Sequence, residues 1–314
     1  MDFIELFAGV ANTTKMARYS HLKSAKFDVL YEAGKKKSHK SDFMNILHSS
    51  GFLLACIWIL KGRSDVGFVV LLATKCSSWG PMNRGTSGRS ACCSVGNLQL
   101  RSVVEGNQLC ERSCLLCLLT MSKGGVWCLE QPGLSVMEFY PAFRYMLNCH
   151  IVAGGNLNKV HRVGWWMGHY GGGTPKRHYC WSSSRHVKSL DKGKFQWKKF
   201  KEEHPNRVET VRRYRDKNNK VRYQGVKNTL RATEIYPIKF ARAVVDLHAR
   251  LISEPVGPAS PPVVPPALQS FLTFPEDSPE QWPHARLGDV FKYLRKLKGL
   301  RVPREWEPHI PDAI

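Results

Sequence analysis

The apolar run from residue 66 to residue 73, VGFVVLLA, most limits what this chain can fold into. A strand of a parallel sheet is buried on both faces and therefore reads as a continuous apolar run. Cys76 follows the run after two residues, and small and polar residues then mark a loop. Open α/β sheets bind ligands at the carboxyl ends of their strands, so we expect Cys76 at a ligand-binding edge.

Two interpretations of Cys76 follow from its surroundings. Lys75 precedes it, and a neighbouring cation lowers the pKa of a thiol and favours the nucleophilic thiolate. The alternative is a buried structural cysteine, because free cysteines are among the most buried residues.

The order of the remaining segments predicts an α/β fold with a doubly wound, mostly parallel sheet. Strand patterns alternate with helix patterns along the chain, and two neighbouring strand patterns come late in the domain. The expected strands are 3–6, 26–32, 66–73, 126–130, 162–169 and 178–182, and the expected helices are 15–19, 43–60, 97–122, 137–148 and 233–252.

Further candidate residues lie where other strands end. Strand 3–6 runs into Phe7, Ala8, Gly9 and Asn12 before a helix, an arrangement that presents backbone N–H groups to a ligand. Glu130 ends strand 126–130. Glu32 ends strand 26–32, where nucleotide-binding folds hold ribose hydroxyls, although a solvated carboxylate explains it as well. Asp42 opens a helix, as a ligand contact or as an N-cap.

The charge of the chain predicts a polyanionic partner, nucleic acid first. The formal net charge is +22 over 314 residues, and segment 188–231 holds fifteen Lys or Arg against five Asp or Glu. Aromatic residues between these charges suit base stacking, although a solvated basic surface is the alternative. These aromatic residues are Phe195, Trp197, Phe200, Tyr214 and Tyr223. The expected phosphate contacts are Lys198, Lys199, Arg212, Arg213 and Arg215.

The composition divides the chain at residue 254. Residues 1–253 form the expected domain, residues 254–266 are a proline-rich linker, and 267–314 are a tail with one basic helix near 287–300. We expect no membrane span, no signal peptide and ten reduced cysteines, hence an intracellular protein. Cys114 and Cys117 lie in an apolar helical run without a second pair, so no metal site is expected.

Four segments in order give the chain a resemblance to a known family. They are ELFAGVAN from Glu5, TKCSSW from Thr74, LEQPG from Leu129 and GGTPKRHYCWS from Gly172. This order resembles the C5-cytosine DNA methyltransferases, whose usual pattern is D-L-F-A-G-x-G-G, a Pro-Cys loop, Glu-Asn-Val and Gln-x-Arg-x-Arg. The resemblance covers roughly residues 1–183, and YPIKF from Tyr236 stands where the last motif of that family lies.

The resemblance implies an enzyme that uses S-adenosylmethionine on a doubly wound sheet. Phe7, Ala8 and Gly9 would line the cofactor turn with Asn12 beside them, Glu32 would hold the ribose and Asp42 would face the adenine.

The resemblance also implies three catalytic roles. Cys76 would be the nucleophile that adds to C6 of cytosine, Glu130 would act at N3, and Arg177 would stabilise O2. The expected substrate is DNA rather than RNA, which would place the protein in the nucleus of a eukaryote. A catalytically inactive relative that binds nucleic acid, and an RNA methyltransferase, remain as alternatives.

Overall fold

The computed structural model describes residues 1–32, 43–154, 159–205 and 210–253. Its centre is a six-stranded sheet in the order β2-β1-β3-β4-β6-β5. The first four strands in this order are parallel, and β6 runs antiparallel to both of its neighbours. The predicted α/β fold with a mostly parallel sheet is therefore confirmed. The proline-rich linker, the tail and Asp42 lie outside the described residues.

The elements follow the alternation expected from the sequence. The strands of the sheet are β1 (Phe3–Leu6), β2 (Ser24–Phe27), β3 (Val69–Leu72), β4 (Val126–Pro132), β5 (His161–Trp166) and β6 (Arg177–Ser182). The helices of the domain are α1 (Asn12–Tyr19), α2 (Ser49–Leu60), α3 (Arg84–Ser87), α4 (Arg101–Ser122), α5 (Pro141–Gly154), α8 (Ile238–Asp246) and α9 (His248–Ile252). Short 3-10 helices are η1 (Val29–Glu32), η3 (Pro81–Asn83), η4 (Met137–Phe139), η6 (Met167–Tyr170) and η7 (Arg185–Leu190).

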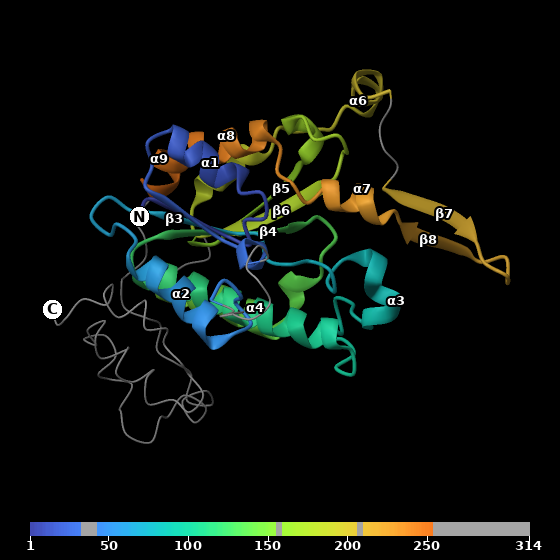
Figure 1. The fold of residues 1–314 in the computed structure, drawn as a ribbon, viewed down its shortest axis with the longest axis horizontal. Coiled ribbons are helices and arrows are strands. Elements are labelled where there is room, and N and C mark those ends of the chain that lie inside the picture. The colour runs from blue at the N-terminus through green and yellow to red at the C-terminus, as the bar shows by residue number, and fades with distance from the viewer. Residues whose placement is uncertain (33–42, 155–158, 206–209, 254–314) are drawn as a thin grey trace.

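Helices cover both faces of the sheet (Figure 1). Alternate residues of each strand point to opposite faces, so one strand supplies two cores. In β3, Val70 and Leu72 pack with α2, α4 and α5, whereas Val69 and Leu71 pack with α1, α8 and α9. The apolar run of the sequence is continuous because both of its faces are covered in this way.

Most predicted boundaries are displaced by a few residues, and in two places a side chain that bonds to the local backbone accompanies the displacement. The strand expected over 26–32 ends at Phe27, because Asp28 Oδ1 accepts the N–H of Leu30 at 2.9 Å and turns the chain into η1. The helix expected over 43–60 begins only at Ser49. Asn45 starts a similar local turn, since its Oδ1 accepts the N–H of Leu47 at 3.0 Å.

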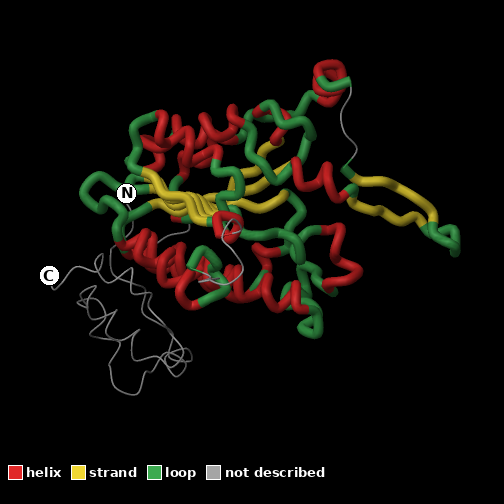
Figure 2. Tube along the Cα trace, in the orientation of Figure 1, coloured by secondary structure: helices red, strands yellow, loops and turns green. Residues whose placement is uncertain are grey.

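The basic segment has its own elements. They are α6 (Trp197–Glu203), the antiparallel hairpin of β7 (Val211–Arg215) and β8 (Val221–Gly225), and α7 (Lys227–Ala232). The β7–β8 hairpin projects away from the six-stranded sheet (Figure 2). The residues of its strands are exposed except at the base, where Val211 and Gly225 pair.

Tyr170, at the end of η6, joins the segment before α6 to helix α8. Its hydroxyl donates to the carbonyl oxygen of Leu190 at 2.7 Å, and its ring meets Phe240 edge-on at 5.3 Å. Both Leu190 and Phe240 are buried in the core on the α1 and α8 face. The chain therefore leaves and re-enters this core beside one side chain.

Candidate functional site

A cavity of about 1020 Å³ lies at the carboxyl edge of the parallel strands. Its wall includes the turn after β1, the residues after β2 and β3, the end of β4 and the start of β6. Residues 233–236, before α8, close another side. The cavity therefore brings Phe7, Ala8, Gly9 and Asn12 together with Cys76 and Glu130, as the positions of these residues after successive strands predict.

The turn after β1 has an unusual backbone. Phe7, Gly9 and Ala11 all have positive φ, at 60°, 50° and 59°. Non-glycine residues in this region store strain of about 1–3 kcal/mol each, and such strain concentrates at ligand-binding sites. Buried Glu5 stabilises the turn from below, because its Oε2 accepts the N–H of Thr14 at 2.7 Å in the first turn of α1. The turn is thus held in its conformation before any ligand arrives.

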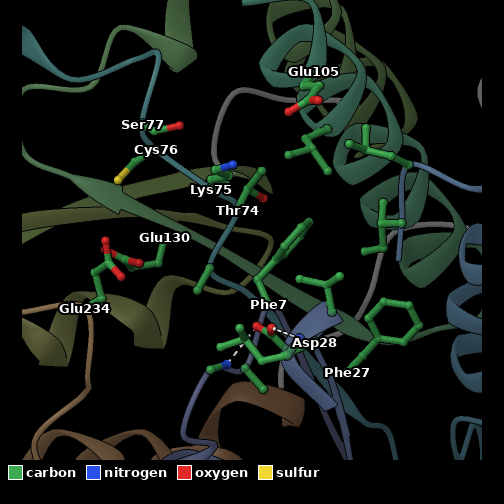
Figure 3. A pocket seen from close by; sticks show the side chains of 18 of the residues that line it. Phe7, Phe27, Asp28, Thr74, Lys75, Cys76, Ser77, Glu105, Glu130 and Glu234 are labelled. Atoms are coloured by element: carbon green, nitrogen blue, oxygen red, sulfur yellow. Dashed lines mark hydrogen bonds between the residues drawn. The ribbon is translucent and has the colours of Figure 1, made fainter. Parts of the chain in front are cut away.

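Asp28 occupies the position that the sequence suggested for Glu32. It directly follows β2, lines the cavity, and accepts the N–H of Gly9 at 2.9 Å through Oδ2 (Figure 3). Glu32 instead falls at the end of η1. The expectation that Glu32 ends a strand is wrong, and Asp28 is the acid that strand β2 delivers to the cavity. The aspartate was missed because the apolar residues after it extend the strand pattern.

Cys76 is half-buried in the cavity wall, and its thiol points toward the side where Glu130 and Glu234 lie (Figure 3). Burial raises the pKa of this thiol, Lys176 lowers it, and the carboxylates of Glu130 and Glu234 raise it again. The expected role of Lys75 is not seen, because its side chain is exposed and the cation that acts on Cys76 is Lys176. Cys76 is therefore a protonated thiol that needs a change around it to ionise.

Glu130 is buried and fully engaged by its neighbours. Oε1 bonds to Nδ1 of His178, and Oε2 accepts the hydroxyl of Tyr236 at 2.6 Å. Burial opposes its ionisation, but the pairing with His178 and these hydrogen bonds, with Lys176 nearby, hold the pKa of Glu130 below its ordinary value. The cavity therefore contains an ionised carboxylate held in one orientation.

Arg177 is not part of the cavity wall. In β6, Arg177 and Tyr179 face one side of the sheet, whereas His178 and Cys180 face the side of Glu130. The guanidinium of Arg177 lies 5.6 Å from the ring centre of Trp166. The prediction that Arg177 reaches the site is wrong by one residue, because strand side chains alternate between faces. Lys176 and His178 line the cavity instead.

Five of the predicted nucleic-acid contacts are exposed. Lys198 and Lys199 lie on α6, and Arg212, Arg213 and Arg215 lie on β7. The hairpin approaches the cavity at one point, because β8 lies next to η3, in the loop after Cys76. The hairpin that carries Arg212, Arg213 and Arg215 therefore lies beside the segment that follows Cys76 in the sequence.

The aromatic residues of the basic segment divide into two groups. Phe195 and Phe200 are buried, and Phe195 stacks on Trp166 at 5.1 Å. They anchor the segment to β5, so the prediction that they stack on bases is wrong. Trp197, Tyr214 and Tyr223 remain exposed by 45% or more.

Metal and membrane sites were also sought in the described ranges. No group of three or more His, Cys, Asp or Glu side chains there could hold a metal ion. Cys114 and Cys117 are buried in α4. None of the helices in those ranges combines the length and the apolar character that a bilayer crossing requires.

Comparisons with protein-family models, with curated proteins and with solved structures find no match for this chain.

Proposed function

We propose that this protein is an S-adenosylmethionine-dependent methyltransferase that modifies C5 of cytosine in DNA. The observation that carries the proposal is the single cavity. It combines a strained small-residue turn, an acid after the second strand, and a cysteine and a buried carboxylate after the next two strands. Open α/β sheets bind cofactor and substrate at this edge.

The residues after β1 and β2 suit an adenosine-type cofactor. Asp28 presents a half-buried carboxylate for ribose hydroxyls, and Val29 and Leu30 beside it expose 51% and 62% of their surfaces. Both apolar side chains lie in the cavity wall and suit a base. The bound cofactor would supply an electrophilic methyl group.

The remaining residues have separate roles in this chemistry. The sulfur of Cys76 forms a bond to C6 of cytosine, which makes C5 nucleophilic. The carboxylate of Glu130 accepts the proton that the Cys76 thiol loses and passes it to N3, where charge develops, and Lys176 takes the role at O2 that the sequence suggested for Arg177. Loss of the C5 proton and cleavage of the bond between sulfur and C6 then release Cys76. The target base must be flipped out or single-stranded to enter the cavity.

The test is methyl transfer with labelled S-adenosylmethionine and a mixture of DNA and RNA. The expected result is label at C5 of cytosine in the DNA, lost in Cys76→Ser and kept in Cys92→Ser. Cys92 is a suitable control because it is an exposed thiol between α3 and α4, on the same connection from β3 to α4 as Cys76. Label on RNA alone would identify RNA instead of DNA as the substrate, and label on another atom would refute the proposal.

A second candidate function is a protein that binds nucleic acid without modifying it. It is favoured by the raised pKa of the Cys76 thiol and by the position of Arg177 outside the cavity. The same experiment separates the two functions. A protein that binds DNA with a strong salt dependence but transfers no label would be such a binder.

A further inference from the structure

Arg89 is a buried arginine behind the loop that follows Cys76. Its residue surface is 2% exposed, and no carboxylate pairs with it among the residues that the structure describes. Burial lowers the pKa of this guanidinium to about 10. An unpaired buried charge costs free energy, so its contacts need an explanation.

The guanidinium joins three separate segments. Nη1 donates to the carbonyl oxygens of Ser94 and Val95, the latter at 3.2 Å, within its own loop. Nη2 donates to Ser78 Oγ at 3.2 Å and to the carbonyl oxygen of Val103 in α4 at 3.0 Å. A planar fork of donors can serve several acceptors at fixed angles, which a lysine ammonium cannot do.

Arg89 also holds the turn that contains Cys76. Its guanidinium carbon lies 3.4 Å from the ring centre of Trp79, which is fully buried. The N–H of Trp79 donates to the carbonyl oxygen of Cys76 at 2.9 Å and closes the turn. The carbonyl oxygen of Trp79 accepts the N–H of Val136 at 3.1 Å, in the loop after β4. One side chain thus supports the turn of Cys76 and its connection to the strand of Glu130.

Helix α4 packs closely against Arg89 and Ser78 at Gly106. A Cβ added at Gly106 of α4 would lie 3.2 Å from Arg89 Nη2 and would collide with Ser78 Oγ. The helix can therefore approach the guanidinium and Ser78 only because residue 106 has no side chain.

We propose that Arg89 is a positioning residue that fixes the thiol of Cys76 relative to Glu130 by holding Ser78 and Trp79 from behind. This inference rests on the proposed function and adds a residue to it. Arg89 itself touches neither substrate nor cofactor. It acts through the turn, so its loss should slow bond formation at Cys76 more than it weakens binding.

The experiment compares Arg89→Met and Arg89→Lys with Arg84→Met. Arg84 is a suitable control because it is an exposed arginine in α3, on the same connection between β3 and α4, and it does not bond to Ser78 or to α4. A 5-fluorocytosine duplex with S-adenosylmethionine traps the Cys76 adduct, since fluorine cannot leave C5 as a proton. The rate of trapping at saturating duplex should fall about tenfold to a hundredfold in both Arg89 variants, the cost of a small misplacement of a reacting group. Dissociation constants for cofactor and duplex should change less than about threefold, well under 1.4 kcal/mol.

Alkylation by iodoacetamide gives a second measurement that does not depend on the proposed function. Mass spectrometry reports labelling of Cys76 relative to the exposed Cys92. A loosened turn should raise the labelling of Cys76 while the rate of trapping falls, and these opposite changes support the proposal. An unmodified protein that traps no duplex refutes the proposed function alone, because the labelling ratio still tests Arg89.

Two results would overturn the role of Arg89. One is an unchanged labelling ratio in Arg89→Met, and the other is a rate of trapping that falls only in step with the folded fraction. If Arg89→Met does not fold, Ser78→Ala removes one contact of the guanidinium and keeps Trp79 in place. In Ser78→Ala we again expect a lower rate of trapping and a higher labelling of Cys76 relative to Cys92.

Discussion

The cavity and the β7–β8 hairpin are opposite kinds of surface. The cavity is built from residues far apart in the sequence, and its key side chains are held by buried neighbours. The hairpin is built from local pairing, and its side chains are exposed. An isolated two-stranded hairpin is marginally stable in water. The sheet therefore fixes the geometry of the cavity, whereas the hairpin contributes mainly exposed positive charge.

The largest expected difference between these regions is in stability. Leu72→Ala, in the strand before Cys76, should lower the free energy of unfolding by about 2–5 kcal/mol, because Leu72 is fully buried. Val221→Ala in the hairpin should change it by less than about 0.5 kcal/mol. Chemical denaturation measures both. Equal losses would mean that the hairpin belongs to the core.

Removing charge from the hairpin should produce the next largest effect. We expect the association constant for duplex DNA to depend less steeply on salt when Arg212, Arg213 and Arg215 are replaced with Gln. The slope of its logarithm against the logarithm of the salt concentration should shrink in magnitude by about 0.9 for each lost phosphate contact. Fluorescence anisotropy at several salt concentrations measures this slope. The thermal midpoint should stay unchanged, since all three side chains are exposed. An unchanged slope would contradict the proposal that the hairpin contacts nucleic acid.

Lys176, just before β6, and Arg177, its first residue, provide a smaller and sharper test, because only Lys176 lines the cavity. Lys176→Met should raise the pKa of Cys76 further and slow its alkylation at constant pH severalfold, because Lys176 opposes the effect of burial. Arg177→Met is the matched control and should leave the rate unchanged. Glu234→Gln should speed alkylation, because its carboxylate raises the pKa. A slower reaction in Arg177→Met would contradict the alternation of faces in β6.

The smallest expected effect is a pH dependence. The folded-state pKa of Glu130 lies below its ordinary value of about 4.3, so its ionisation stabilises the fold above that pH. This stabilisation should be lost as the pH falls below about 4.3 through the folded-state pKa. In Glu130→Gln the unfolding free energy should therefore fall less steeply with acid. The residues that face the carboxyl group, His178, Tyr236 and Lys176, are the same in both proteins that this experiment compares.

The sequence predicts the strands of the site better than it predicts which side chain each strand presents. Cys76 and Glu130 follow long apolar runs, and such runs identify buried strands whatever packs on them. Asp28 was missed because the turn at β2 depends on a side chain that bonds to its own backbone. Arg177 was chosen in place of Lys176 because the face of a strand residue depends on register with β4, which the sequence does not contain.

Burial also could not be predicted for the basic segment. Phe195 and Phe200 stand among lysines in the sequence, much as Tyr214 and Tyr223 stand among arginines. Only the two tyrosines are exposed. Phe195 stacks on Trp166, more than twenty residues earlier in the chain, and Phe200 packs on Phe195. Arg89 is a further example, because its partners lie on three segments and no local pattern connects them.

The contacts of Tyr170 with Leu190 and Phe240 decide which part of the chain can change in length without disturbing the core. The stretch between Phe200 and Thr233 leaves a fixed core and returns to it, since Leu190 before it and Phe240 after it both contact Tyr170. It ends before residues 233–236, which line the cavity. Doubling the length of a flexible connection costs only about 0.6 kcal/mol. This stretch can therefore be lengthened, shortened or exchanged for another while the sheet keeps its cavity. The exposed surface of the hairpin can in this way change independently of the cavity.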